Sequence, residues 1–222
     1  MALKVLGLST SPRDRGNSDL LVREALRGAE SAGADGEYLS LRGLSVHPCV
    51  ECNACAGTGL CRVGDDLQQV LDRVLAADRL IFGTPVFFMA VCAQAKLLID
   101  RCQCLWSRKY VLKQPVFAGG PRDRRALVIA VGGTKSKQMF ECVGLTMKYW
   151  FDVLDVRHAA NLFVNQVDGR GDILQHPAAM QEAFRLGAAL ADTAAPVPEK
   201  PATVELFGPA LPGRAQGENH GG

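Results

Sequence analysis

Hydrophobic positions along the chain follow two alternating periods. Short apolar runs, such as residues 3–8, end at polar or glycine residues. Longer stretches follow these runs, and in them apolar residues recur every three or four positions, as Leu21, Ala25 and Ala29 do within residues 18–32. The short runs are typical of buried strands and the longer stretches of amphipathic helices. The pattern therefore predicts that strands and helices alternate along most of the chain.

The alternation defines five strand–helix units. The predicted strands are residues 3–8, 37–40, 79–84, 126–131 and 158–165. The predicted helices are residues 18–32, 91–104, 138–154 and 177–194, and one that Asp65 and Asp66 can cap. Such repetition implies right-handed crossovers and a parallel sheet covered on both faces. We therefore expect an α/β, flavodoxin-like fold: a doubly wound, five-stranded parallel sheet with helices on both faces, a ligand beyond the carboxyl ends of the strands, and an inserted cysteine loop.

The pattern changes near the carboxyl end of the chain. Residues 1–195 are expected to form the flavodoxin-like domain, with the cysteine loop at residues 47–64. From Pro196 onwards proline and glycine dominate, so residues 196–222 are predicted to form a flexible tail. Within that tail, residues 204–207 can dock on a neighbour.

Composition narrows the class of protein. The chain has 222 residues, of which 48% are apolar, and no run of eighteen apolar residues that could span a bilayer. The net charge is +2 with both signs interspersed, so we expect neither nucleic acid nor a membrane as a partner. Residues 122–125 are interpreted as a solvated turn. The first apolar run is too short for a signal peptide, and with eight cysteines the chain is expected in a reducing cytoplasm.

Four cysteines fall within thirteen residues, in the pattern C-x₂-C-x₂-C-x₅-C: Cys49, Cys52, Cys55 and Cys61. Closely spaced thiolates of this kind most resemble the ligands of an iron–sulfur cluster, and Gly57 and Gly59 give the loop freedom to wrap a bulky core. Two alternatives stay open. Zinc also takes four cysteines, although usually from two separated C-x₂-C pairs, and a redox-active C-x-x-C is the other.

The loop after the first predicted strand is rich in short hydrogen-bond donors. Hydroxyl groups come from Ser9, Ser11 and Ser18, and Asn17 and Arg13 add an amide and a cation. The loop leads into a helix N-terminus, which favours an anion. Neither the Walker A motif nor the dinucleotide fingerprint is present, so the loop suits a monophosphate such as that of FMN. The alternative is an ordinary serine-rich turn with Ser18 as the helix cap.

Two further strand ends are expected to face the same cleft. The first carries Pro85 and Val86, followed by the aromatic pair Phe87 and Phe88. The second is the segment Gly132, Gly133 and Thr134. A flavin needs an apolar wall for its rings and backbone N–H donors at its polar edge, and these two segments can supply them. The phenylalanines are otherwise typical core residues.

Together these segments resemble the iron–sulfur flavoproteins, a branch of the NAD(P)H-dependent FMN reductase group with flavodoxin-like folds. The resemblance covers about residues 3–168. The segments that carry it are Ser11-Pro12-Arg13 with Gly16-Asn17-Ser18, the four-cysteine run continuing into Asp65-Asp66, and Gly83-Thr84-Pro85-Val86-Phe87-Phe88 with Ala93-Gln94-Ala95-Lys96 and Ile99-Asp100-Arg101.

The resemblance implies two cofactors. FMN would bind noncovalently, with its phosphate at Ser9, Ser11, Arg13, Asn17 and Ser18, its ring beside Pro85, Val86, Phe87 and Phe88, and its polar edge at Gly132, Gly133 and Thr134. A [4Fe–4S] cluster would bind Cys49, Cys52, Cys55 and Cys61. Because members are dimers or dimers of dimers, with the flavin near a subunit interface, we expect a homodimer or homotetramer.

These cofactors predict a function. FMN exchanges two electrons as a hydride or one at a time, whereas a cluster exchanges one. We therefore expect an oxidoreductase with no catalytic acid–base pair. The resemblance to the family implies that it passes electrons from a reduced nicotinamide or a ferredoxin-type donor to a quinone, an oxygen species or another small acceptor. The alternatives are a non-catalytic, flavodoxin-like electron carrier and a flavin-only reductase whose cysteine loop binds zinc.

Overall fold

The computed structural model describes residues 2–117 and 122–208. A sheet runs through the molecule in the order β2-β1-β3-β5-β6-β7, with every neighbouring pair parallel, and β4 pairs antiparallel with β3. The strands are β1 (Lys4–Ser9), β2 (Asp35–Ser40), β3 (Arg79–Phe87), β4 (Ala90–Val91), β5 (Arg125–Val131), β6 (Arg157–Asn165) and β7 (Ala202–Phe207).

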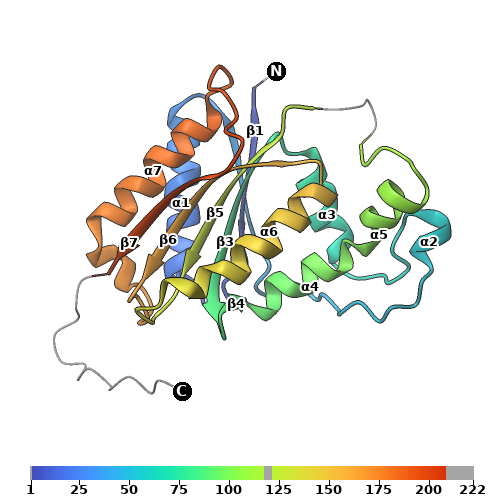
Figure 1. The fold of residues 1–222 in the computed structure, drawn as a ribbon, viewed down its shortest axis with the longest axis horizontal. Coiled ribbons are helices and arrows are strands. Elements are labelled where there is room, and N and C mark those ends of the chain that lie inside the picture. Colours follow the sequence, from blue (N-terminus) through green and yellow to red (C-terminus); the bar gives the residue numbers. More distant parts are fainter. Residues whose placement is uncertain (1, 118–121, 209–222) are drawn as a thin grey trace.

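Helices cover both faces of this sheet. Figure 1 shows α1 (Asn17–Ser31) and α7 (Pro177–Ala191) on one face, and α3 (Leu67–Ala76), α4 (Ala93–Arg101) and α6 (Glu141–Val153) on the other. Successive residues of a strand point to opposite faces, so Ile81 packs in the core under α1 and α7 while Phe82 packs in the core under α3, α4 and α6. The predicted flavodoxin-like, doubly wound α/β class is confirmed.

Within residues 2–117 and 122–208 the sheet has seven strands, two more than the five predicted. All five predicted strands are present, and β4 and β7 are the additions. β7 arises from the segment predicted to be a flexible tail: residues 202–207 lie parallel to β6, with Val204 and Leu206 packed against the core beneath α7. The alternation of Val204 and Leu206 with polar neighbours is a strand signal that the surrounding proline and glycine concealed.

Two predicted helices are divided. The helix expected over residues 91–104 ends at Arg101, and α5 (Gln103–Trp106) and a π-helix (Ser107–Val111) follow it. The helix expected over residues 138–154 begins as a 3₁₀ turn (Lys137–Phe140) before α6. A further short helix, α2 (Cys55–Thr58), lies within the cysteine loop. In the described ranges we find no helix with the length and apolar character that crossing a membrane requires.

The arginines of residues 122–125 are not all solvated, contrary to the interpretation of this segment as an exposed turn. Arg124 is 1% exposed, and its guanidinium donates to the carbonyl oxygens of Ala77 (2.8 Å) and Leu154 (2.7 Å). These carbonyls belong to the C-caps of α3 and α6. Burial lowers the pKa of Arg124 to about 10. One buried side chain therefore satisfies the ends of two helices on the same face of the sheet.

Candidate functional site

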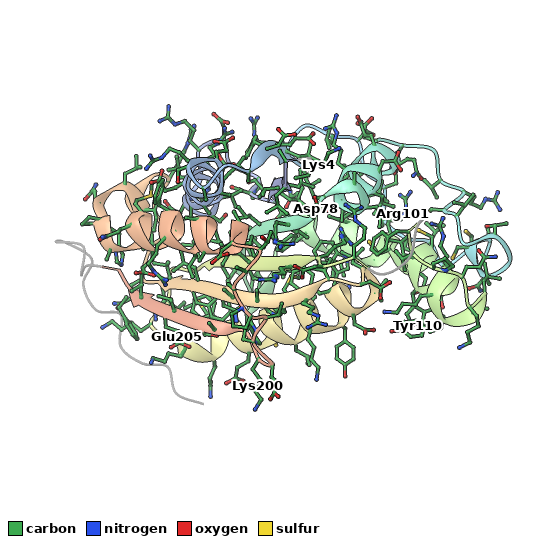
Figure 2. The ribbon with its side chains drawn as sticks, turned by 90° about the horizontal axis from the view of Figure 1, so that it is seen from above. Lys4, Asp78, Arg101, Tyr110, Lys200 and Glu205 are labelled. Carbon is green, nitrogen blue, oxygen red and sulfur yellow. The ribbon has the colours of Figure 1, made fainter. Side chains whose placement is uncertain are left out.

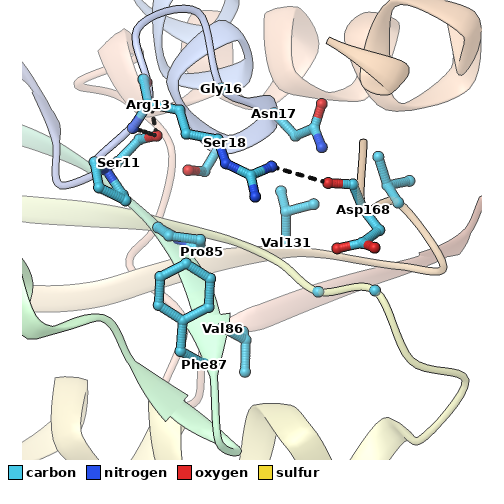
Figure 3. A pocket seen from close by; sticks show the side chains of 14 residues that line it. Ser11, Arg13, Gly16, Asn17, Ser18, Pro85, Val86, Phe87, Val131 and Asp168 are labelled. Carbon is cyan, nitrogen blue, oxygen red and sulfur yellow. Dashed lines mark hydrogen bonds between the residues drawn. The ribbon is translucent and has the colours of Figure 1, made fainter. Parts of the chain in front are cut away.

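A pocket lies at the carboxyl edge of the sheet, where the loops after β1, β3 and β5 meet. Register brings these strand ends together, because Ser9 pairs with Gly83 and Pro85 pairs with Val131. The residues that line the pocket are Ser11, Pro12, Arg13, Gly16, Asn17, Ser18, Pro85, Val86, Phe87, Val131, Gly132, Gly133, Val167 and Asp168 (Figure 3). Of the twelve residues predicted to hold FMN, nine are in this set.

The three others lie outside the pocket lining. Ser9 is 1% exposed, at the end of β1 beneath the loop. Phe88 is fully exposed at the turn between β3 and β4. Thr134 donates through its hydroxyl to the sulfur of Met139 at 3.7 Å. Their predicted contacts with FMN therefore have no support from the geometry of this pocket.

The amino end of α1 forms one wall of the pocket. α1 begins at Asn17, with the extended residue Gly16 as its N-cap, so the first N–H groups of the helix face the loop. The Oγ of Ser18 is buried and has no hydrogen-bond partner among the described residues. A β-carbon at position 16 would lie 2.5 Å from the Ser11 Oγ, so only glycine lets the loop close this tightly. These groups fit a phosphate monoester, which would give Ser18 a partner.

Two polar side chains connect this loop with the loop after β6. Arg13 donates from Nη1 to the carbonyl oxygen of Asp168 at 3.2 Å (Figure 3). Asn17 donates from Nδ2 to the carbonyl oxygen of Gly169 at 2.8 Å, and its Oδ1 accepts from the N–H of Ile173 at 3.2 Å. Through both the nitrogen and the oxygen of its side-chain amide, Asn17 thus links the start of α1 to the segment after β6.

The apolar wall of the pocket comes from the last residues of β3. Val86 pairs with Val91 and Phe87 with Ala90, so β3 and β4 form a hairpin whose turn is Phe88-Met89. Both turn residues have positive φ, 49° and 62°, as the two central residues of a type I′ turn do. The hairpin places Pro85, Val86 and Phe87 along the pocket.

The glycines after β5 approach their neighbours closely. A β-carbon at Gly132 would collide with the sulfur of Met139, and one at Gly133 would lie 3.1 Å from the Asp168 side chain. The N–H of Gly132 donates to the carbonyl oxygen of Val164 at 3.0 Å. That N–H is therefore part of the sheet and not the expected donor to a ring edge.

Five of the residues that line the pocket were not predicted from the sequence to belong to the site. Pro12, Gly16 and Val131 are immediate neighbours of predicted ones. Val167 and Asp168 belong to the loop after β6, which borders the pocket because β6 lies next to β5. The signal that could have found these two is the strand order, since a fourth strand end must face the same edge.

The four cysteines of the loop line a second cavity, together with Arg101 and Cys104. Cys49 and Cys52 are exposed, and Cys55 and Cys61 are half-buried. Glu51 and Asn53 have φ values of 51° and 57°, so the loop coils between the thiols. In residues 2–117 and 122–208 no three histidine, cysteine or acidic side chains converge closely enough to hold one metal ion. The four thiols therefore share one cavity.

Two hydrogen bonds reach the sulfur atoms of this loop. Arg101 donates from Nε to the Cys61 Sγ at 3.2 Å, and Ser107 donates its hydroxyl to the Cys55 Sγ at 3.6 Å. Arg101 also pairs with Asp65, at 2.8 Å. Burial would by itself raise the pKa of the Asp65 carboxyl, but hydrogen bonds from Arg101 and from the His47 and Leu67 N–H groups hold that pKa below its ordinary value.

The cysteines near the end of α4 play a different part. Cys102 is buried and accepts a hydrogen bond from Nε1 of Trp150 at 3.2 Å. Burial raises the pKa of the Cys102 thiol to about 12. A thiol held neutral in this way packs as a small apolar group.

Comparison with known proteins places this architecture in a family. The family model described as NADPH-dependent FMN reductase matches residues 3–166. The chain belongs to this family. A Bacillus subtilis member, YwqN, whose printed name describes an NAD(P)H-dependent FMN-containing oxidoreductase, is 30% identical over 83% of this chain and 96% of its own length.

Other relatives of the chain bear the name iron–sulfur flavoprotein. The protein MJ1083 of Methanocaldococcus jannaschii is 44% identical over 46% of this chain and 53% of its own length. One from Methanosarcina thermophila is 30% identical over 60% of this chain and 65% of its own length. The chain therefore spans about half to two thirds of these relatives. The predicted resemblance to iron–sulfur flavoproteins and FMN reductases is confirmed.

Solved structures share the fold. An NAD(P)H:quinone oxidoreductase from Methanothermobacter marburgensis superposes with a TM-score of 0.63 over 88% of this chain and 100% of its own, at 18% identity. A flavone reductase superposes with a TM-score of 0.62 over 85% of this chain and 62% of its own, at 22% identity. At these identities the similarity concerns the fold alone.

Proposed function

We propose that the protein is an oxidoreductase that uses FMN and a [4Fe–4S] cluster. It would pass electrons from a reduced nicotinamide or a ferredoxin-type donor to a quinone, an oxygen species or another small acceptor. The observation that carries this proposal is the joining of two sites by one helix. The N-cap of α4, Cys92, contacts Thr10 and Thr84, which are sequence neighbours of residues that line the first pocket. The last residue of α4, Arg101, contacts Cys61 in the cysteine loop.

The first pocket would hold FMN through its own residues. The Ser18 hydroxyl and the first N–H groups of α1 would bind the phosphate, and Arg13 would balance its charge. Pro85, Val86 and Phe87 would exclude water from one face of the ring. The names of the relatives, which specify FMN and NAD(P)H, support this assignment.

The second cavity would hold the cluster through its four thiols. Two features support a cluster over zinc: the spacing of the cysteines, which line one cavity, and the name carried by several relatives. The bonds from Arg101 and Ser107 are of the kind that stabilises thiolate ligands. When bound, FMN supplies two-electron and one-electron chemistry, and the cluster supplies one-electron chemistry.

The protein's part in this chemistry is to position the two sites. Cys92, the N-cap of α4, donates through its thiol to the carbonyl oxygen of Thr10 at 3.1 Å, and its N–H donates to the Thr84 hydroxyl at 3.2 Å. Both partners lie next to pocket residues. The nine residues of α4 span about 14 Å, at 1.5 Å for each residue, so the helix fixes the separation of the two sites.

The test is anaerobic purification followed by quantification of FMN, iron, acid-labile sulfide and zinc. We expect one FMN and about four iron and four sulfide per chain, and steady oxidation of NADH or NADPH when a quinone is supplied. Cys55→Ala should lose iron and keep FMN, whereas Cys142→Ala, an exposed cysteine on α6, should keep both.

Each failure of this test has its own meaning. One zinc per chain without sulfide would make the protein a flavin-only reductase with a zinc-bound loop. Full cofactor content with negligible turnover would make it an electron carrier. Colourless protein would contradict both cofactor assignments.

We also propose a homodimer or homotetramer located in the cytoplasm. All eight cysteines are free thiols, which suits a reducing compartment. Phe87, Phe88 and Met89 are consecutive exposed apolar residues beside the first pocket, and a contiguous apolar patch of this kind marks a contact surface. Light scattering coupled to size exclusion measures the mass, and a monomer at micromolar concentration would contradict the oligomer.

A further inference from the structure

Arg101 makes more hydrogen bonds than a helix-terminal arginine needs. It is the last residue of α4, and its side chain is 1% exposed. Nε donates to the Cys61 Sγ at 3.2 Å, Nη1 to the His47 carbonyl oxygen and to Asp65 Oδ2, both at 2.8 Å, and Nη2 to the Val63 carbonyl oxygen at 3.2 Å and to Asp65 Oδ1 at 3.3 Å. These contacts engage the whole planar fork of donors of one guanidinium.

The acceptors lie at the two ends of the cysteine loop. His47 comes two residues before Cys49, and Val63 comes two residues after Cys61. Asp65, the ion-pair partner of Arg101, belongs to the same hydrogen-bond network, because it also accepts the His47 N–H at 2.9 Å and the Leu67 N–H at 3.0 Å. The pair of Arg101 and Asp65 therefore fastens both ends of residues 47–63 to α3 and α4.

The hydrogen bonds to sulfur are distributed unequally over the loop. Cys61 receives a donor that carries a full positive charge, and Cys55 receives the neutral hydroxyl of Ser107. Cys49 and Cys52 are exposed. Charged hydrogen bonds are stronger than neutral ones, and a buried cation favours the more negative of two states of a neighbouring group. Hydrogen bonds to ligand sulfurs are among the factors that set the potential of a cluster.

Figure 2 shows Arg101 at the end of the molecule that the cysteine loop forms, far from Glu205 of β7. We propose that Arg101 is the positioning residue of the cysteine site. It closes the loop of residues 47–63 before any cofactor binds, and it raises the reduction potential of the bound cluster through the sulfur of Cys61. The second half of this inference depends on the proposed cluster, whereas the first half does not.

The experiment compares two variants. Arg101→Gln removes both the positive charge and the planar set of guanidinium donors, whereas Arg101→Lys keeps only the positive charge. Arg62→Gln is the matched control, because Arg62 lines the same cavity and is exposed. Amide hydrogen exchange of residues 47–63 is measured on the chain freed of cofactors. The midpoint potential of the anaerobically loaded protein is then measured by a titration followed by visible and electron paramagnetic resonance spectra.

We expect exchange of the loop amides to be about tenfold faster in both Arg101 variants and unchanged in Arg62→Gln. The midpoint potential should shift to more negative values in Arg101→Gln, and less so in Arg101→Lys. Unchanged exchange in Arg101→Gln overturns the closing role, and an unchanged potential overturns the tuning role. A wild-type chain that binds no cluster contradicts the proposed function, yet the exchange result still decides the closing role.

Removing Arg101 alone leaves the Asp65 carboxylate buried without its cation, which can prevent folding. The double variant Arg101→Gln/Asp65→Asn removes both charges and is then measured in the same way. Faster loop exchange in a folded double variant supports the proposal, and wild-type exchange overturns it. Ser107→Ala supplies an independent comparison, because it removes a neutral donor to Cys55, and should lower the potential less than Arg101→Gln does.

Discussion

Gly16 and Ser11 approach each other so closely that a β-carbon at position 16 would lie 2.5 Å from the Ser11 hydroxyl. Ser11 itself accepts the Arg13 N–H at 3.1 Å and donates to the Arg13 carbonyl oxygen at 2.9 Å. A side chain at Gly16 would therefore force the Ser11 hydroxyl to shift and would disturb the loop that leads into α1 and lines the pocket.

Gly16→Ala is therefore expected to weaken FMN binding by about tenfold, the cost of displacing one or two hydrogen-bond donors. Fluorescence titration of the cofactor-free chain with FMN measures the dissociation constant. Gly144→Ala is the control, because nothing lies within 4 Å of a β-carbon there and the residue is in the interior of α6. That substitution should leave FMN binding unchanged and stabilise the fold by about 0.5–1 kcal/mol.

Ser18→Ala is expected to have opposite effects on binding and on stability. The Ser18 Oγ is buried with no partner in the described structure, so its removal should leave the free energy of unfolding of the cofactor-free chain equal or higher. FMN should bind about tenfold more weakly, because the phosphate loses a hydroxyl donor. Thermal unfolding with and without FMN measures both effects.

Ser9→Ala is the matched control for this substitution. The Ser9 Oγ is also buried and lacks a hydrogen-bond partner among the described residues, but Ser9 does not line the pocket. We expect the same effect on unfolding and no effect on FMN binding. Weaker FMN binding by Ser9→Ala, with Ser18→Ala unchanged, would reverse the assignment of the two hydroxyls.

The sequence predicted the five principal strands, four of them because each is a short apolar run next to a helix with a 3.6-residue period. Boundaries agree within a few residues, as for Arg79–Phe87 against the predicted 79–84. The hydroxyl-rich loop was also predicted, since the residue types of a phosphate site are contiguous in sequence. The fold and one wall of the pocket are therefore local properties of the chain.

The rest depends on contacts between distant segments. The sequence could not show that Arg101 reaches Cys61, since 40 residues separate them and Arg101 alone resembles any helix-terminal cation. Asn17 was expected at the phosphate, but its amide bonds the loop after β6, which only the strand order places nearby. The exposed position of Phe88 follows from the hairpin with β4, a strand too short to give a periodic signal.

Asp65 is expected to make the fold sensitive to acid. Its pKa in the folded chain lies below the ordinary value of 3.8, so the folded state binds fewer protons than the unfolded state as the pH falls through that region. The stabilisation is complete above the unfolded pKa, near pH 4, and is lost as the pH falls through the folded pKa.

Asp65→Asn should therefore be less stable than the wild type at pH 7 and should lose less stability between pH 5 and pH 2. Urea unfolding at each pH measures the two profiles. Parallel profiles over this range would show that the bond from Arg101 to Asp65 contributes no pH-dependent stability.

The last prediction concerns the turn at Phe88 and Met89. Both residues have positive φ, 49° and 62°, a conformation that costs side chains such as these about 1 kcal/mol each. A type I′ turn favours asparagine followed by glycine. Met89→Gly should therefore raise the melting temperature by about 3 °C, and adding Phe88→Asn to it should raise the melting temperature further.

If the exposed Phe88 ring contacts a second copy of the chain, Phe88→Asn should also weaken self-association, whereas Met89→Gly should not. Sedimentation equilibrium of the two variants separates these effects, because they relieve strain at adjacent positions but only one removes the exposed ring. A Phe88→Asn variant that is more stable and equally oligomeric would show that the ring takes no part in the interface, and a change confined to its FMN binding would assign the ring to the flavin instead.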